Sequence, residues 1–343
     1  SSAASDVYKR QIIISLLWER VTMGFKGFKV YLLGGKEYFE IKDHVSNESC
    51  WVNSKMVYTF PDTLLSFLYL DMNPWRQKID AAFSALQKLR LEKDESDLNV
   101  VWELLSGLSK EHIYFECFRL NWYEWIRQAK EQQYMGARYI PIRKMCQLKA
   151  NVHRTQQQLL QLFHDVLSDE SGDDSISRKL RRYEESGCML ERFEFTPLTL
   201  RYEAVGNDDY TEVLYAQSMN DVIEYEVRQC LARGIKMRRC KNCGRYFAVT
   251  GHASTEYCDR VFDEKGRTCK DVGAFRQYSR THKDDAVFCE YRREYKRRFA
   301  WIKSGRISDS QFYAWSEQAR EQKKKCDNKV ITIEAFSDWL KKS

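Results

Sequence analysis

The sequence predicts a mostly helical α+β protein, and three observations lead to this fold class. Of the 343 residues, 43% are hydrophobic and 14% aromatic while only 4 are Pro, which is typical of a packed, helix-rich globular chain. A region near the N-terminus alternates apolar and polar residues, as half-buried strands do. Most other apolar residues recur every three or four positions, as amphipathic helices require. A chain of this length is expected to hold two domains.

Residues 1–22 are expected to precede the native protein. Residues 1–11 resemble a translated sequencing-adaptor tail, so they are excluded from fold reasoning. The codons for Trp18-Glu19-Arg20 can form a purine-rich ribosome-binding site shortly before Met23. We therefore expect Met23 to be the native start and the source to be bacterial. The apolar run 12–18 is shorter than the roughly 20 residues of a membrane span. We therefore expect no membrane contact.

An N-terminal α+β domain of unknown role is expected over residues 23–234. Gly34-Gly35 separates two strand-like runs within Val30–Ile41, which predicts a hairpin, and a third strand is expected over Met56–Phe60. The alternating segment Phe193–Ala204 predicts a further strand.

Residues 62–167 are predicted to be helical, and their apolar and Trp residues to form the core. The predicted core residues include Leu64, Leu65, Phe67, Leu68, Ile79, Phe83, Leu86, Leu89, Val101, Leu104, Leu105, Trp75, Trp102, Trp122 and Trp125. A flexible acidic loop, without the spacing of an EF-hand, is expected over 168–175.

A well-marked helix precedes the cysteine-rich region. Ser218 and Asp221 approximate a capping box, and Gly234 lies where a C-terminal cap belongs. Cys230 belongs to the apolar stripe of this helix, so it is expected to be a core thiol rather than a metal ligand.

Four cysteines have the spacing of a zinc site. Cys240 and Cys243 form a Cys-x2-Cys knuckle followed at once by Gly244, and Cys258 and Cys269 follow after 14 and 10 further residues. Four thiolates in tetrahedral array favour Zn²⁺, so one structural zinc ion is the expected cofactor.

The segment 235–280 is expected to fold as a treble-clef-like module. Residues 245–250 are predicted to lead out as a strand, 256–258 to return beside it, and 271–278 to form a helix. His252, in the intervening loop, is an alternative ligand. Tyr246 or Phe247 could cover one side of the metal.

The cysteine cluster favours a structural role over a catalytic one. A catalytic zinc needs an open position and a general base, and the His-x-Glu motif of deaminases is absent. A Cys-x2-Cys motif can alternatively be a redox pair, but such pairs occur between a strand and a helix in thioredoxin-like folds. The 11 Cys form an odd number without an export signal, which favours reduced thiols and a cytoplasmic location.

A basic helical tail is expected over 281–343. Residues 228–343 hold 28 Lys and Arg against 15 Asp and Glu, an excess that suits a polyanion such as DNA. A helix starting at 281–284 is predicted to present its cations on one face, and these are Arg292, Arg293, Lys296, Arg297 and Lys303. Alternatively, cations near the cysteines simply balance the charge of a zinc–thiolate centre.

Two short helices are expected to complete a small bundle at the C-terminus. The pattern at Ile307-Ser308 recurs 24 residues later at Ile331-Thr332, with Ser308 and Thr332 as N-caps. Each copy carries a Phe and a Trp that could pack on the basic helix.

The cysteine region resembles a known family. Arg239–Phe247, Tyr257-Cys258 and Cys269 are similar to the CGNR zinc-finger proteins, bacterial regulators, and more so to uncharacterised proteins of gut Firmicutes that carry the same finger. The resemblance covers residues 218–280 and implies that the four cysteines bind zinc. Residues 269–272 lack the Gly-Asn-Arg of the family, and 259–268 is an insertion.

The leading functional hypothesis is therefore a bacterial zinc-binding regulator whose basic C-terminal half contacts DNA. Its N-terminal domain would then sense a small ligand or a protein partner. A second hypothesis is a zinc-stabilised protein-interaction scaffold that binds no nucleic acid. A third is an enzyme with its site in the N-terminal domain, although the sequence contains no catalytic motif that we recognise.

Overall fold

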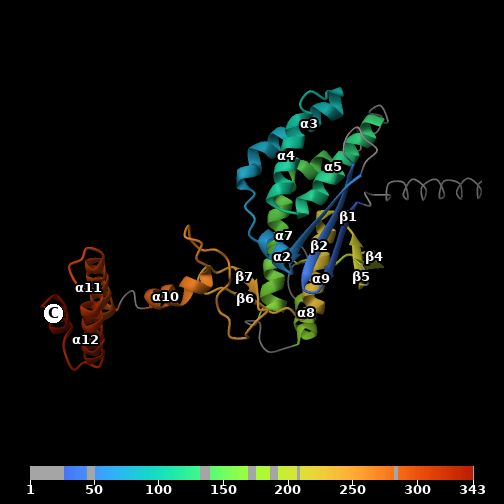
Figure 1. The fold of residues 1–343 in the computed structure, drawn as a ribbon. Helices are drawn as coiled ribbons and strands as arrows, with labels where there is room; N and C mark the ends of the chain where they lie inside the picture. Colours follow the sequence, from blue (N-terminus) through green and yellow to red (C-terminus); the bar gives the residue numbers. More distant parts are fainter. Residues whose placement is uncertain are drawn as a thin grey trace, which may run out of the picture. The chain divides into compact units, whose positions relative to one another are not determined.

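The computed structural model describes residues 27–44, 51–131, 140–168, 175–185, 192–206, 209–281 and 285–342. It confirms a mostly helical α+β fold with a small antiparallel sheet. The chain forms two compact units (Figure 1). Unit 1 consists of residues 1–238 and 246–253, and unit 2 of 239–245 and 254–343. The expected leader 1–22 and the start at Met23 lie outside the described residues.

Unit 1 contains a five-stranded antiparallel sheet in the order β3-β2-β1-β5-β4. The strands are β1 (Phe28–Leu33), β2 (Lys36–His44), β3 (Trp51–Thr59), β4 (Leu200–Val205) and β5 (Asp209–Tyr215). The predicted hairpin is confirmed, because Gly34 and Gly35 turn the chain with φ of 57° and 77°. The third strand is also present, but it begins before the expected Met56.

One expected strand is shorter than predicted. Residues 193–199 form no strand, and β4 begins only at Leu200. Side chains bind this part of the backbone instead: the N–H of Phe193 donates to Tyr183 Oη at 2.7 Å, and the N–H of Thr196 donates to Glu224 Oε1 at 2.7 Å. These bonds replace a strand ladder.

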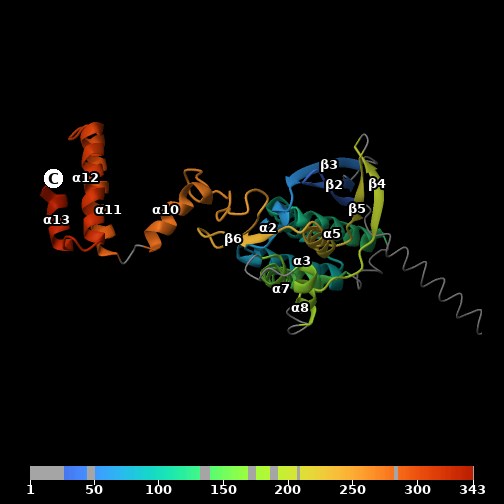
Figure 2. The same ribbon diagram turned by 90° about the horizontal axis from the view of Figure 1, so that it is seen from below.

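Helices pack on one face of the sheet, as Figure 2 shows. They are α2 (Asp62–Phe67), α3 (Arg76–Glu92), α4 (Leu98–Glu111), α5 (Tyr114–Glu131), α6 (Ile142–Cys146), α7 (Leu148–Leu162), α8 (Ile176–Glu185) and α9 (Met219–Ala232), with short η1 (Asn73–Trp75) and η3 (Phe163–Leu167). The predicted core residues lie in one cluster, where Trp122 is fully buried and Phe83, Trp75, Trp102 and Trp125 are partly buried. Ser168, which was expected in a flexible loop, is buried and forms an isolated parallel β-bridge with Met237. The rest of that expected loop, residues 169–174, lies outside the described residues.

Helix α9 has the predicted ends. Ser218 and Asp221 form a capping box, in which each side chain binds the backbone of the other. Gly234 ends the helix with a φ of 62°, a conformation that favours glycine. Cys230 is fully buried, as expected of a core thiol.

Unit 2 ends in three helices with their own core. They are α11 (Ala286–Lys303), α12 (Asp309–Asp327) and α13 (Ile333–Lys342), preceded by α10 (Cys269–Thr281). The core residues are Phe312, Trp315, Ala319, Cys326, Phe336 and Leu340. Ser308 and Thr332 accept bonds from the backbone N–H groups of Gln311 and Ala335, as N-caps do.

The start of the basic helix differs from the prediction. Residue 281 ends α10 rather than beginning a new helix, and α11 is capped by Asp285, whose carboxylate accepts from the N–H of Phe288 at 2.9 Å. This carboxylate satisfies a free N–H group and lies at the positive end of the helix dipole. Residues 282–284 lie outside the described part of the chain. Among the described helices, none is both long enough and apolar enough to cross a membrane.

Candidate metal centre

The first pair of cysteines lies in a tight turn between β6 (Met237–Arg239) and β7 (Tyr246–Ala248). The N–H of Gly244 donates to Cys240 O at 2.8 Å, and the N–H of Cys240 donates to Arg245 O at 2.9 Å. Gly244 has a φ of 74°, which side chains rarely adopt. This turn brings the Cys240 and Cys243 thiols to the same side.

The expected pairing of this strand was wrong. β7 pairs with β6, and residues 256–258 form no strand beside it. A single backbone bond, from the N–H of Lys241 to Glu256 O at 3.0 Å, brings the returning chain back to the knuckle instead. The strands that flank the knuckle are adjacent in sequence, so they pair with little loss of chain entropy.

The second pair of cysteines is joined by another hairpin, formed by residues 259–268. Val261 and Thr268 pair across it, and the N–H of Phe262 donates to Arg267 O at 2.7 Å. At its base the N–H of Lys270 donates to Cys258 O at 3.1 Å. This hairpin therefore brings together two cysteines that have ten residues between them in the chain.

Cys269 is the first residue of α10, and two features hold this helix in place. Thr268 caps it through a reciprocal pair of bonds with Asp271, at 2.7 Å and 3.3 Å. The ring of Tyr257 lies directly on Gly273, where a Cβ atom would come within 2.1 Å of the ring. Tyr257 thus fixes the distance between α10 and Cys258, its neighbour in sequence.

The four thiols of Cys240, Cys243, Cys258 and Cys269 form one cluster. Their sulfur atoms all lie within 4.8 Å of one another, and those of Cys243 and Cys258 are 3.7 Å apart. Sulfur atoms bonded to zinc at about 2.3 Å in tetrahedral array lie about 3.8 Å apart. A disulfide would bring two of them to about 2.0 Å. The geometry is therefore that of a thiolate metal centre.

Hydrogen bonds to sulfur complete the cluster. The N–H of Cys258 donates to Cys240 Sγ at 3.4 Å, and the amide of Asn242 donates to Cys269 Sγ at 3.3 Å. Such donors orient metal ligands and stabilise the thiolate. We did not predict this role of Asn242 from the sequence, although a polar residue inside a Cys-x2-Cys turn could have indicated a donor to sulfur.

The charge state of the cluster favours a cation. Burial opposes ionisation of Cys240, but backbone N–H groups outweigh it and lower the pKa of this thiol to about 7. Burial raises the pKa of Cys258 to about 12, and the neighbouring Cys240 thiolate adds to the effect. A second thiolate thus forms readily only when a metal ion compensates its charge. His252 is exposed and lies outside the group.

The structure places the predicted basic residues in different environments. Arg293 pairs with Glu290 and Arg297 with Glu294, each at 2.6 Å. Arg292 lies over the ring of Phe275, with 5.1 Å between the guanidinium carbon and the ring centroid. Lys296 and Lys303 are exposed and make no hydrogen bond or ion pair within the described residues. The predicted cationic face is thus partly neutralised.

The fold and the cysteine cluster describe an α+β protein with a candidate metal centre, and comparison with known proteins adds one match. A model of a family of unknown function (DUF6076) matches residues 199–341, from the start of the β4–β5 hairpin to the last helix. No curated protein and no solved structure matches the chain. This match does not show the CGNR family, so that resemblance rests on Arg239–Phe247, Tyr257, Cys258 and Cys269 alone.

Proposed function

We propose that Cys240, Cys243, Cys258 and Cys269 bind one Zn²⁺ in a closed, structural site. The clustering of the four sulfur atoms carries this proposal. Four thiolates fill a tetrahedral shell and leave no position for substrate. Structural zinc contributes roughly 10 to 16 kcal/mol in finger peptides, enough to fold a module with few aliphatic residues.

Metal analysis of the purified full-length protein tests this site. We expect about one zinc per chain, because the cluster has four ligands for a single ion. Cys258→Ser should lose most of the zinc, whereas Cys146→Ser, an exposed cysteine outside the cluster, should keep it. Full zinc content in the Cys258→Ser protein would contradict the proposed ligand set.

We further propose that unit 2 binds DNA and that the protein acts as a regulator. Residues 239–245 and 254–343 hold 24 Lys and Arg against 15 Asp and Glu, so this unit attracts a polyanion. Lys296 and Lys303 are free to contact phosphates. Arg293 pairs with the partly exposed Glu290, and such surface ion pairs are weak and exchange readily for phosphate contacts, whereas Glu294, the partner of Arg297, is buried.

The salt dependence of DNA binding tests the interface. Each lost phosphate contact lowers the slope of log K against log salt by about 0.9, so Lys296→Ala with Lys303→Ala should lower it by about 2. Arg293→Ala with Arg297→Ala should also lower it. Arg90→Ala with Lys110→Ala removes two exposed cations from unit 1 and serves as the control. An unchanged slope in both unit 2 double variants would count against DNA binding.

A second candidate function is a protein-interaction scaffold, and α10 supplies the observation that favours it. Phe275 and Tyr278 are 62% and 48% exposed on this helix, and large exposed aromatic residues often mark protein contacts. A scaffold should purify at low salt without nucleic acid, as the ratio of absorbance at 260 and 280 nm reports. Nucleic acid that co-purifies and dissociates with salt would favour the first candidate.

A further inference from the structure

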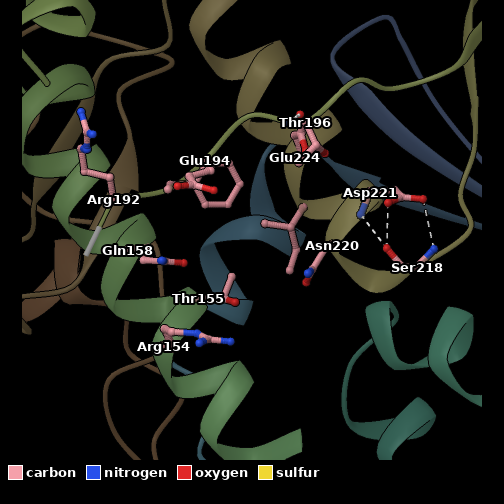
Figure 3. Close-up of a pocket in the computed structure, with 12 residues that line it drawn as sticks. Arg154, Thr155, Gln158, Arg192, Glu194, Thr196, Ser218, Asn220, Asp221 and Glu224 are labelled. Atoms are coloured by element: carbon pink, nitrogen blue, oxygen red, sulfur yellow. Dashed lines mark hydrogen bonds between the residues drawn. The ribbon is translucent and has the colours of Figure 1, made fainter. Parts of the chain in front are cut away.

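A hollow of about 450 Å³ lies in unit 1 between α7, the segment 192–199 and the first turns of α9 (Figure 3). Small-molecule sites commonly have volumes of roughly 300 to 1,000 Å³. The side chains that matter here are Arg154 and Thr155 of α7, Phe193 and Glu194 of the segment, and Asn220 and Ile223 of α9.

The walls of the hollow are fixed by bonds between them. Glu224 of α9 accepts from the N–H and the hydroxyl of Thr196, at 2.7 Å and 2.6 Å, which holds the segment against the helix. Asp221 accepts from the N–H and hydroxyl of Ser218 at the start of the helix, as the dashed lines in Figure 3 mark. These two carboxylates are committed to structure, so the hollow is formed in advance of any ligand.

Other polar groups in the hollow are uncommitted. Within the described residues, the Glu194 carboxylate, the Asn220 amide and the Thr155 hydroxyl make no hydrogen bond or ion pair. In the described part of the chain, Arg154 binds the amide oxygen of Asn151, at 2.9 Å, and pairs with no carboxylate. In Figure 3 Arg154 and Thr155 line one wall on α7, Asn220 lies across from them at the start of α9, and Glu194 lies above both on the segment 192–199.

The charges select the chemistry of a ligand. Arg154 and Asn220 offer donors to an anionic group, while Glu194 offers an acceptor to a cationic one. A purely anionic ligand would be repelled by Glu194, although a second arginine, Arg192, also lines the hollow and Glu224 is already paired with Arg228 at 2.6 Å. A purely cationic ligand would be repelled by Arg154. A small molecule that carries both charges satisfies all of these groups.

We propose that this hollow binds a free α-amino acid. Its carboxylate would bind Arg154 and Asn220, its ammonium group would bind Glu194, and its side chain would contact the apolar surface of Phe193 and Ile223. The volume suits a ligand of this size. The proposal does not depend on zinc or DNA binding.

The experiment uses the full-length, zinc-containing protein and each of the twenty L-α-amino acids, first by thermal shift and then by calorimetry. We expect at least one to bind with a Kd below roughly 1 mM. Its N-acetyl and carboxamide derivatives, which lack the ammonium and the carboxylate, should each bind at least about tenfold more weakly, because each loses a charge-assisted bond.

Variants locate the site. Arg154→Met and Glu194→Gln should each weaken binding about tenfold or more, while Arg90→Met, the same change at an exposed position on α3, should leave it unchanged. Both pocket residues are exposed, so neither change should unfold the protein. The proposal is overturned if no amino acid binds, if both derivatives bind as tightly as the parent, or if both pocket variants bind normally.

Discussion

Two glutamates are buried side by side in the core of unit 1, one on β2 and one on α9. Glu37 accepts from the N–H of Thr63 at 2.9 Å, but its second oxygen, Oε2, has no partner within the described residues. Glu226 accepts from the hydroxyls of Thr63 and Tyr114, at 3.0 Å and 2.6 Å. Both carboxyl groups are fully buried, and no cation pairs with either in the described part of the chain.

Burial determines the charge of this pair. It raises the pKa of Glu37 to about 7 and, together with the charge of Glu37, raises the pKa of Glu226 well above its usual value. Nearby His112 supplies no positive charge, because burial lowers its pKa to about 4. At neutral pH the pair therefore keeps at least one proton.

We predict that stability decreases as the pH rises from 5 to 8. Glu37 is protonated in the folded protein up to about pH 7, whereas it ionises near pH 4.5 when unfolded. Between these values the folded state binds more protons, so the free energy of unfolding falls as pH rises. Glu37 alone accounts for about 2 kcal/mol over this range, and Glu226, whose pKa is also raised, adds to the fall. Urea unfolding at several pH values measures the decrease.

Glu37→Gln tests the cause of this decrease. The amide keeps an acceptor for the N–H of Thr63 and never ionises, so the part of the pH dependence that comes from Glu37 should disappear, whereas the part from Glu226 should remain. Glu111→Gln changes an exposed residue of α4 and serves as the matched control. A Glu37→Gln protein that loses stability between pH 5 and 8 as the original does would exclude Glu37 as the titrating group.

At the scale of elements, α10 depends on a glycine in its interior. Glycine inside a helix is usually unfavourable by about 1 kcal/mol relative to alanine. Gly273 is retained where the ring of Tyr257 covers the helix backbone, and any Cβ atom would overlap that ring. This contact positions the segment that carries Cys258 against the helix that begins at Cys269.

We predict that Gly273→Ala weakens the metal centre, although alanine favours helices. Tyr257 must move to admit the methyl group, which displaces Cys258 from Cys269. Competition with a chelating dye should show at least about tenfold weaker zinc binding, since a displacement of this kind is expected to cost more than 1.4 kcal/mol. Gly251→Ala, which places a methyl group in open space, should bind zinc normally. Equal affinities in the two variants would show that the ring contact does not position the ligands.

At the scale of the whole molecule, each unit has its own core. The core of unit 1 joins the sheet to helices α2 to α9, and the three C-terminal helices of unit 2 enclose a separate cluster. The segment between them, around the four cysteines, contributes few apolar residues, so its folding should depend on metal.

We predict that removing zinc unfolds this segment selectively. After chelation, hydrogen exchange measured by mass spectrometry should accelerate for peptides within 256–281, because the thiolates lose the ion that holds them together. Peptides from β1 and β2 should keep their protection, since that sheet is far from the cysteines in sequence and belongs to unit 1. The control is the same protein resupplied with zinc, in which protection of 256–281 should return. Equal acceleration in the β1–β2 hairpin would mean that unit 1 also depends on the metal.

Local features were predictable from the sequence because they depend on nearby residues. The Gly34-Gly35 hairpin, the Ser218 capping box and the Gly234 cap each involve residues within a few positions of one another. The spacing of the four cysteines likewise marked the candidate metal centre before any geometry was known.

The sequence by itself therefore determined the fold class, the ends of several helices and the residues of the cysteine cluster. Only the tertiary structure decided that β1 pairs with β5 and that Glu226 meets Glu37. The physical reason is that pattern and spacing encode contacts along one element, whereas pairing between distant segments depends on how the whole core packs.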